Sequence, residues 1–394
     1  MEKLKREVGQ ELKENIMPFW TAMVDDENGG FYGRMNGEGI LCKDAPKGAV
    51  LNARILWAFA AAYRTTKDYK YLELAIRAKR YLIDNFYDNK NGGIYWMLNA
   101  DGTPRDTKKQ IYALGFAIYG LSELYRSTND AESLEYAVML YESIEQHAYD
   151  EKYGGYFEAF TQDWGQIDDV RLSEKDANDR KTMNTHLHIL EPYTNLYRIW
   201  PDINLKCRIK ELMDIFLERI YNAQIGHFDL FFADDWKRNS SLQSYGHDIE
   251  AAWLLWEAAC VIDSGVHKKK LVDLVKKIAD VSLSEAFNKD GGMEYEYNPS
   301  VGIRDNDCHW WVQAESVVGF LYAYKITGNN NYLNVARSSW DYIKRYIIDK
   351  CRGEWYWSLF ANGKVNMKDD KAGPWKCPYH NTRMCLEVVN FEVV

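Results

Sequence analysis

The sequence predicts an all-α protein, an (α/α)6 barrel of twelve helices with short β-hairpins at its rim. One observation behind this prediction is a glycine-led aromatic stretch that recurs six times along the 394 residues. The other is that two segments with helical periodicity lie between successive stretches. The stretches begin at Gly29, Gly92, Gly154, Gly226, Gly291 and Gly353, with spacings of 63, 62, 72, 65 and 62 residues. A repeat of this length indicates an array of similar structural units.

Each glycine-led stretch alternates aromatic and polar residues, as in GGFYG, GGIYW and GEWYWS, and that alternation is typical of a short strand. Turn pairs follow some of these stretches, namely Asn36-Gly37, Asp101-Gly102 and Asn362-Gly363. Such pairs favour tight hairpin turns. We therefore expect one short hairpin in each unit.

Helices fill the remainder of each unit. Apolar periodicity places them at residues 2–18, 48–65, 68–86, 107–127, 131–147, 180–199, 203–221, 245–263, 267–287, 308–326, 330–348 and 379–392. A pair of helices cannot bury its apolar face alone, whereas six pairs in a closed ring can, with an inner ring wrapped by an outer one. An open helical solenoid is the alternative, and the six units favour the closed ring. We expect one catalytic domain over residues 1–394.

The composition favours a sugar-binding protein over one that binds nucleic acid or a membrane. A net charge of −9 argues against nucleic acid or an anionic membrane as partner, because both require a basic face. The 14 Trp and 28 Tyr residues offer aromatic platforms that stack on sugar rings, although core packing accounts for most of them.

Three features indicate a cytoplasmic protein. The seven cysteines are scattered and lack any CxxC pair, which suits a reducing compartment. The N-terminal stretch MEKLKREVGQELKENIMPFW has no apolar centre of the kind found in a signal peptide. The longest apolar run, residues 55–63, is too short to span a bilayer. We expect a cytoplasmic monomer.

The helix that follows each hairpin is expected to belong to the inner ring, and the first turns of these helices then point to one mouth of the barrel. Polar and aromatic residues gather in those turns. They are Asn52, Arg54, Tyr112, Asn184, His188, His247, Glu250, Trp310, Trp311 and His380. Convergence of such groups from separate helices predicts a deep pocket with titratable residues.

His247 and Glu250 are the first candidates for acid–base chemistry. They are three residues apart in SYGHDIEAAWLLWE, so they share one face of the expected helix. The positive end of the helix dipole disfavours the histidine cation, whereas Glu250 acts in the opposite direction and orients the ring. We therefore expect a base with a pKa near 7. The alternative is a histidine and a glutamate that satisfy each other at a helix end.

The stretch GPWKCPYHN supplies two more candidates. Pro374 and Pro378 exclude a helix interior, so we expect a rigid loop that presents Trp375 and places His380 at the start of the last helix. His380 is then expected to have the same dipole-lowered pKa as His247.

One of two neighbouring histidines in NTHLHILE completes the set. His186 and His188 are two positions apart, about 200° around a helix, so only one can face the interior. Asn184 and Glu191 lie on the same stripe as His188, which favours His188, and His186 is expected to pack elsewhere.

Other interpretations of these residues remain open. His188, His247 and His380 with Glu250 could hold zinc or iron, although no HxxxH or HExxH spacing supports a metal site. Glycoside hydrolysis needs two carboxylates across the scissile bond, and the candidates here are chiefly histidines. The segment from Thr161 to Asp179, which carries Asp168, Asp169, Glu174, Asp176 and Asp179, is expected to be either a rim loop over one mouth or a solvated loop.

Several longer segments resemble the cellobiose 2-epimerases, within the N-acylglucosamine 2-epimerase superfamily. They are NARILWAFAAAY (52–63), KTMNTHLHILEPYTNLYR (181–198), SYGHDIEAAWLL (244–255), WWVQAESVVGF (310–320) and GPWKCPYHNTRMCLE (373–387). The resemblance runs from the first helix to the last, and it implies the same (α/α)6 barrel.

The resemblance implies cofactor-free epimerisation at C2 of the reducing-end glucose of a β-1,4-linked disaccharide, such as cellobiose to glucosyl-mannose or lactose to epilactose. It implies that His247 and His380 are the acid–base pair, that Arg54 and His188 stabilise an enediolate, and that Glu250 is a partner of His247. Residues that hold the sugars are then Tyr112, Asn184, Trp310 and Trp375.

The nearest rival within the same superfamily acts on monosaccharides, as an N-acylglucosamine 2-epimerase or a mannose isomerase. Rivals of other classes are a glycan-binding protein with a degenerate barrel and a glycoside hydrolase. Turnover of cellobiose against glucose, exchange of the C2 proton with solvent, and release of free glucose distinguish them.

Overall fold

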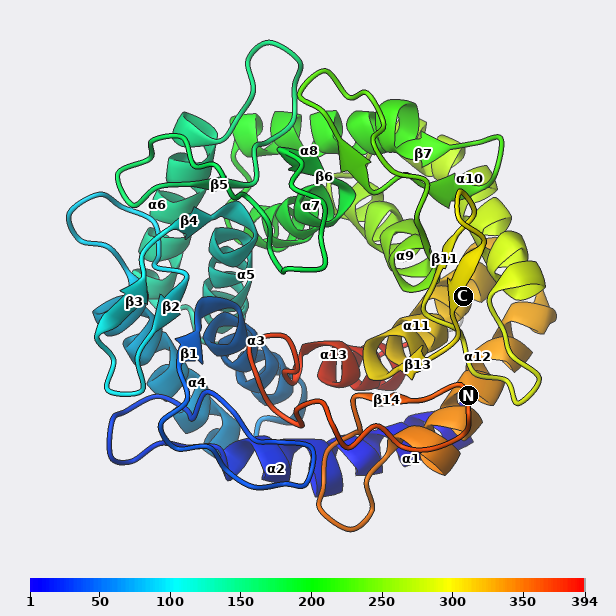
Figure 1. Ribbon diagram of the computed structural model, residues 1–394, viewed down its shortest axis with the longest axis horizontal. Helices are drawn as coiled ribbons and strands as arrows, with labels where there is room; N and C mark the ends of the chain where they lie inside the picture. Colours follow the sequence, from blue (N-terminus) through cyan, green and yellow to red (C-terminus); the bar gives the residue numbers. More distant parts are fainter. Residues whose placement is uncertain (393–394) are drawn as a thin grey trace.

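Two concentric rings of helices form the protein in the computed structural model, which describes residues 1–392 (Figure 1). The inner ring consists of α3 (Ala49–Thr66), α5 (Ile111–Thr128), α7 (Met183–Tyr197), α9 (Tyr245–Val261), α11 (Trp310–Thr327) and α13 (Tyr379–Val389). Each inner helix packs against the next, and α13 packs against α3, which closes the ring.

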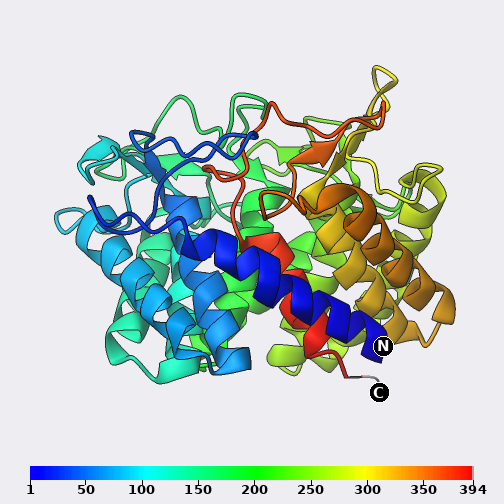
Figure 2. The same ribbon diagram turned by 90° about the horizontal axis from the view of Figure 1, so that it is seen from below.

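The outer ring consists of α1 (Glu2–Glu11), α4 (Tyr69–Tyr81), α6 (Ala131–His147), α8 (Ile203–Ile215), α10 (Gly265–Glu285) and α12 (Asn330–Tyr342). Four outer helices continue into π-helical turns, η1 (Leu12–Ile16), η2 (Leu82–Phe86), η3 (Phe216–Ile220) and η4 (Ile343–Ile347), and α2 (Met17–Thr21) follows η1. The N-terminal helix packs across α13, the last inner helix (Figure 2). The predicted barrel of six helix pairs is therefore confirmed over the described residues.

The helix boundaries agree with the sequence prediction except at the start of three inner helices. Helices were expected to begin at residues 107, 180 and 308, but α5, α7 and α11 begin four, three and two residues later. They follow the strands β4 (Lys109–Gln110), β6 (Lys181–Thr182) and β13 (Cys308–His309). The predicted starts were wrong because these residues pair with a neighbouring unit before the chain turns into the helix.

A belt of short strands ties the units together at one end of the barrel, where the loops also gather (Figure 2). The strand before an inner helix pairs antiparallel with a strand of the next unit in β1–β2, β4–β5, β6–β9, β10–β11 and β13–β14. Their remaining bounds are β1 (Lys47–Gly48), β2 (Met97–Leu98), β5 (Ala159–Phe160), β9 (Phe231–Phe232), β10 (Gln243–Ser244), β11 (Glu296–Asn298) and β14 (Ser358–Leu359). A bridge between Met35 and Ala372 joins the last unit to the first. The belt holds the first turns of all the inner helices at the same mouth.

The predicted hairpins lie at this same end. Tight turns carry the pairs Asp101-Gly102 and Asn362-Gly363, with Gly102 (φ 88°) and Gly363 (φ 80°) in the left-handed region. The first hairpin differs, because Gly39 (φ 83°) and not Gly37 adopts the left-handed conformation after Asn36. Four further strands complete the hairpins: β3 (Pro104–Asp106), β12 (Ile303–Asp305) and the paired β7 (Tyr221–Asn222) and β8 (His227–Phe228).

Buried ion pairs recur in four of the units. A lysine at the strand that precedes an inner helix bonds an aspartate at the turn before the glycine-led stretch: Lys47–Asp25 (2.7 Å), Lys109–Asp88 (2.8 Å), Lys181–Asp150 (2.6 Å) and Lys371–Asp349 (2.7 Å). In the other two units the equivalent positions hold uncharged residues, Gln243 with Asn222 and Cys308 with Asn288. The charge is therefore either present on both partners or absent from both.

Replacing Lys181 by methionine is expected to lower the free energy of unfolding by about 3–5 kcal/mol, because it leaves the Asp150 carboxylate buried without a cation. The double variant Asp150→Asn/Lys181→Gln reproduces the uncharged pair of the fourth unit and should recover most of that loss. Urea unfolding of the three proteins measures the difference. Equal losses in the single and double variants would contradict the ion-pair explanation.

Candidate active site

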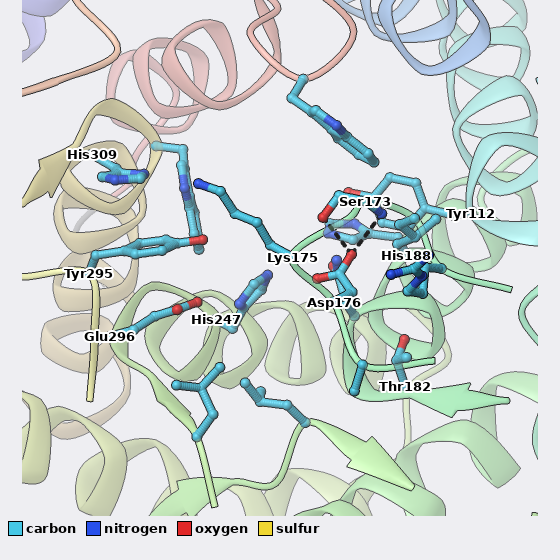
Figure 3. Close-up of a pocket in the computed structure, with 18 of the residues that line it drawn as sticks. Tyr112, Ser173, Lys175, Asp176, Thr182, His188, His247, Tyr295, Glu296 and His309 are labelled. Atoms are coloured by element: carbon cyan, nitrogen blue, oxygen red, sulfur yellow. Dashed lines mark hydrogen bonds between the residues drawn. The ribbon is translucent and has the colours of Figure 1, made fainter. Parts of the chain in front are cut away.

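A pocket of about 630 Å³ opens at the mouth of the barrel that the strands surround. All but one of the residues expected from the sequence at this mouth line the pocket, as Figure 3 shows for three of them. The exception is Asn52, which is buried and donates to the backbone oxygen of Gly48. The predicted residues that line the pocket are Arg54, Tyr112, Asn184, His188, His247, Glu250, Trp310, Trp311, Trp375 and His380. They come from α3, α5, α7, α9, α11, α13 and the loop before α13, so the closed ring of helices brings them together.

Three histidines of the pocket are held in the same way. The Nδ1 atom of His188 lies 3.1 Å from Glu191 Oε2, that of His247 lies 2.8 Å from Ser244 Oγ, and that of His380 lies 2.7 Å from Glu315 Oε1. Within residues 1–392, the Nε2 atom of each ring has no hydrogen-bond partner. When Nδ1 carries the proton and donates it to its partner, Nε2 presents a lone pair to the pocket.

His186, in contrast, uses both ring nitrogens inside the protein. Its Nε2 accepts the backbone N–H of Tyr156 at 2.9 Å, and its Nδ1 lies 2.7 Å from the carbonyl oxygen of Thr182. The prediction that His188 and not His186 faces the interior is confirmed.

Two glycines allow the rings to approach one another. Gly246 precedes His247, and a Cβ atom there would stand 2.6 Å from the Trp311 ring. Gly115 on α5 lies against the backbone of His188, where a Cβ atom would stand 2.3 Å from the carbonyl oxygen. Any larger residue at either position would displace a histidine or the ring beside it.

The predicted pairing of Glu250 with His247 is wrong. Ser244 is the partner of His247, and Glu250 instead accepts a hydrogen bond of 2.5 Å from Arg383, with its Oε1 atom 3.9 Å from His380 Nδ1. The spacing predicted correctly that His247 and Glu250 share one helix face, but Glu250 bonds Arg383 from α13 and not His247. The guanidinium is the stronger partner because it carries a full charge.

The expected histidine pKa near 7 is also wrong. Burial lowers the pKa of His247 to about 3, and it holds the pKa of His380 well below the usual value. Both rings are therefore neutral at pH 7, which is the protonation state of a base. Sequence alone indicated the direction from the helix dipole but not the larger effect of complete burial.

Below the histidines, Arg383 gathers three carboxylates. It donates to Glu191, to Glu250 at 2.5 Å and to Glu315 at 2.6 Å. Burial raises the pKa of Glu250 to about 8 and also raises that of Glu315, whereas the Arg383 charge outweighs burial at Glu191 and holds its pKa at about 2. Hydrogen bonds thus connect His188, Glu191, Arg383, Glu315 and His380 in one chain.

The structure brings together a different set of potential metal ligands from the set considered from the sequence. The group that comes within ligand distance is Glu250, Glu315 and His380, whose ligand atoms lie within 4.8 Å of one another, and not the three histidines considered from the sequence. Arg383 donates to both carboxylates, so its guanidinium takes the position that a metal cation would need.

Arg54 is a buried cation of a different kind. Its guanidinium lies 4.0 Å from the centre of the Phe116 ring and 4.5 Å from that of Tyr379. It donates to Tyr112 Oη at 2.7 Å and to Cys377 Sγ at 3.4 Å, and its Nε atom has no partner. Among residues 1–392 no carboxylate forms an ion pair with it. An unbalanced buried cation beside a polar pocket suits an anion that forms there.

Aromatic side chains line both sides of the pocket. Trp311, which the sequence placed in the first turn of an inner helix, lies 4.8 Å from the His247 ring and 5.4 Å from the His380 ring, measured between ring centres. Trp310 packs at 4.7 Å on Trp357, and Trp375 lies 5.9 Å from Tyr112. The buried side-chain oxygen of Asn184 has no partner, so it is free to accept a hydrogen bond in the pocket.

The segment between Thr161 and Asp179 is a rim loop, as one of the two interpretations of the sequence predicted. Its residues 170–177 and 179 line the pocket. Asp176 accepts hydrogen bonds of 2.9 Å from the backbone and the hydroxyl of Ser173, and Lys175 extends into the cavity (Figure 3).

The sequence did not lead to Glu315 and Arg383 as site residues, although they lie in segments 310–320 and 373–387, which resemble the family. A spacing of three residues joins His188 to Glu191, His247 to Glu250 and His380 to Arg383, so the pattern that drew attention to one pair occurs in three inner helices. Glu315 follows Trp311 by four residues and so shares its helix face.

The raised pKa of Glu250 predicts a stability difference that depends on pH. A folded-state pKa of about 8 against 4.5 contributes stability that is present below pH 4.5 and is lost as the pH rises through about 8. Glutamine cannot ionise, so the Glu250→Gln variant does not lose stability in this way as the pH rises. Relative to the variant, the wild-type Tm should therefore fall as the pH is raised from about 5 to about 9. A pH-independent difference in Tm would contradict a protonated Glu250.

These features together define an (α/α)6 barrel with neutral histidines and a buried arginine in a polar pocket at one mouth. In the described part of the chain, no helix has the length and apolar character needed to cross a membrane. The family model described as N-acylglucosamine 2-epimerase (GlcNAc 2-epimerase) matches residues 30–383. The chain belongs to the N-acylglucosamine 2-epimerase family.

Relatives match the chain over almost its whole length. The cellobiose 2-epimerase of Bacteroides fragilis is 54% identical over 387 residues, which cover 98% of each chain. The cellobiose 2-epimerase of Ruminococcus albus is 40% identical, with 97% of each chain covered. The solved structure of cellobiose 2-epimerase from Bacillus thermoamylovorans B4167 superposes with a TM-score of 0.95 at 42% identity and covers 99% of each chain.

Proposed function

We propose that this protein epimerises C2 of the reducing-end glucose of β-1,4-linked disaccharides and oligosaccharides, converting cellobiose to glucosyl-mannose and lactose to epilactose. The cellobiose 2-epimerase from Bacteroides fragilis, at 54% identity over 98% of both chains, supports this substrate class. A pocket of about 630 Å³ is within the range of small-molecule sites and has room for more than one sugar ring.

The observation that carries the chemistry is the combination of His247 and His380, each with a free Nε2 atom, and an unpaired buried Arg54 in one pocket. His247 and His380 act as base and acid on opposite faces of C2. The Trp311 ring lies beside both histidines, 4.8 Å from His247 and 5.4 Å from His380 between ring centres.

The reaction begins with ring opening, in which a proton moves from O1 to O5 and leaves an aldehyde at C1. One histidine Nε2 then takes the proton from C2, the C–H electron pair forms the C1–C2 double bond, and negative charge develops on O1. Arg54 stabilises this enediolate with a buried positive charge that is already in place, and His188 stabilises it when a second proton, on Nε2, lets the ring donate to the enediolate while Nδ1 donates to Glu191. The other histidine takes up a proton from solvent at its Nε2 atom and donates it to the opposite face of C2, which inverts C2, and the first histidine releases to solvent the proton that it removed.

Tyr112, Asn184, Trp310 and Trp375 hold the two sugars in this proposal, and Glu250 supports His380 through Arg383. The site needs no cofactor or metal for these steps, because every proton donor and acceptor named is a side chain. We further propose a cytoplasmic monomer with one catalytic domain, in keeping with the net charge of −9 and the scattered cysteines.

Proton NMR of cellobiose with EDTA-treated protein in deuterated water tests the proposal. The expected result is a growing mannose-type anomeric signal together with loss of the C2 proton signal. Unchanged cellobiose would reject the disaccharide assignment, and N-acetylglucosamine and mannose would then be tried. Released glucose would indicate a hydrolase, and binding without exchange at C2 would indicate a glycan-binding protein.

A further inference from the structure

A second cavity, of about 730 Å³, lies at the opposite end of the barrel from the histidines. Its lining includes Arg64 in the last turn of α3, Arg126 in the last turn of α5 and Arg198 directly after α7. Arg198 is ten residues beyond His188 on the same helix, which places the two about 15 Å apart along the axis. The cavity is therefore separate from the pocket already described.

The three arginines occupy equivalent positions in three successive units. Arg64 and Arg126 are 62 residues apart, and Arg126 and Arg198 are 72 apart, which are two of the spacings of the repeat. Cations are favoured at the C-terminal ends of helices, so the macrodipole accounts for one basic residue per helix. It does not account for three guanidinium groups that border one cavity.

In each of the three arginines, some nitrogens of the guanidinium group donate hydrogen bonds to the protein and the others do not. Arg64 Nε donates to Glu123 at 2.5 Å, Arg126 Nη1 donates to Glu123 at 2.8 Å and to Asn195 at 2.7 Å, and Arg198 Nη2 donates to Glu257 at 2.6 Å. Their other nitrogens have no hydrogen-bond partner within residues 1–392. A guanidinium has five N–H donors, so several donors remain available to the cavity.

The wall of the cavity carries cations and no carboxylate. Besides the three arginines it consists of Tyr125, Asn129, Tyr197, Ile199 and Val261. Glu123 is buried behind the arginines and is not part of the wall. Glu123 bonds Arg64 and Arg126, and Glu257 bonds Arg198, so two carboxylates oppose three guanidinium groups and the cluster keeps a positive excess on a chain with a net charge of −9.

We propose that this cavity binds a small dianionic oxyanion, a phosphate or a carboxylate carried by a small organic molecule. Planar guanidinium groups pair bidentately with both kinds of oxyanion, and donors fixed from behind lose little freedom on binding. Tyr125 and Tyr197 would contact the organic part of the ligand. The same three helices carry Arg54, Tyr112 and His188 at the other mouth, so a bound anion would join the ends of the helices that build that part of the pocket.

Isothermal titration of the full protein with inorganic phosphate, phenyl phosphate and citrate tests this site. Saturable binding is expected, with phenyl phosphate tighter than inorganic phosphate if the tyrosines contact the organic part, while citrate distinguishes a carboxylate from a phosphate preference. The variant Arg198→Gln should weaken binding about tenfold or more, because it removes one bidentate partner. Glu257, which this variant releases, is partly exposed and can be solvated.

Arg64→Gln is the second variant, since Glu123 keeps its bonds to Arg126 and Asn195. Both variants should keep the wild-type Tm in the absence of added anion, which separates loss of binding from loss of fold. Chloride at matched ionic strength is the control for general salt effects. Absence of saturable binding for all three probes, or equal affinity in the wild type and both variants, would overturn the proposal.

Discussion

Replacing either His247 or His380 by asparagine is expected to reduce epimerisation of cellobiose by about 10³-fold or more. A positioned acid or base contributes about 10²–10⁴-fold, and inversion at C2 requires both groups in every turnover. Asparagine keeps a donor near the position of Nδ1, so Ser244 and Glu315 retain a partner and the fold should persist. The rate is measured by NMR, and sugar binding by calorimetry.

The two variants should differ in one respect. The variant that keeps the base on the glucose side can remove the C2 proton and return deuterium to the same face, so it should exchange without inversion. That result identifies which histidine takes the proton from glucose. His147→Asn is the matched control, because His147 stacks on Trp164 at 4.3 Å outside the pocket. Nearly full activity in either active-site variant would reject the assignment.

The fold could be predicted from sequence because the repeat recurs at the level of whole units. Six glycine-led stretches at regular spacing leave room for two helices each, and only a closed ring buries the inner helices on all sides. In α3, all residues from Ala49 to Ala62 are buried. The start of α7 could not be predicted as well, because Lys181 and Thr182 continue the helical pattern but pair with β9. That pairing lies in another unit, which local periodicity does not report.

The site residues were predictable as a set but not in their partnerships. Placing the first turns of the inner helices at one mouth was enough to collect His188, His247 and His380. Which carboxylate meets which histidine depends on how α9, α11 and α13 are rotated, and that rotation is set by packing. Arg383 on α13 donates to Glu250 on α9 and to Glu315 on α11. No residue spacing within a single helix predicts a contact between helices.

The proposed role of Arg54 as a stabiliser of the enediolate predicts opposite effects on activity and stability. Arg54→Met should lower kcat by about 10²–10³-fold, as expected when one stabiliser of a developing oxyanion is removed, with a smaller change in KM. The same change should leave the Tm equal or higher, because the guanidinium is buried between Phe116 and Tyr379 without a carboxylate, and methionine fills apolar space without a desolvation cost. Initial rates and thermal melting of the variant measure both effects.

Arg383→Met provides the contrast, since Arg383 is equally buried but bonds Glu191, Glu250 and Glu315. Removing it leaves three carboxylates without their cation, so the free energy of unfolding should fall by about 3–5 kcal/mol. If Arg54 were only a structural residue, both variants would lose stability. Opposite changes in Tm would instead mean that Arg54 lowers the stability of the fold. The protein would then keep this residue because the reaction needs a positive charge where the enediolate forms.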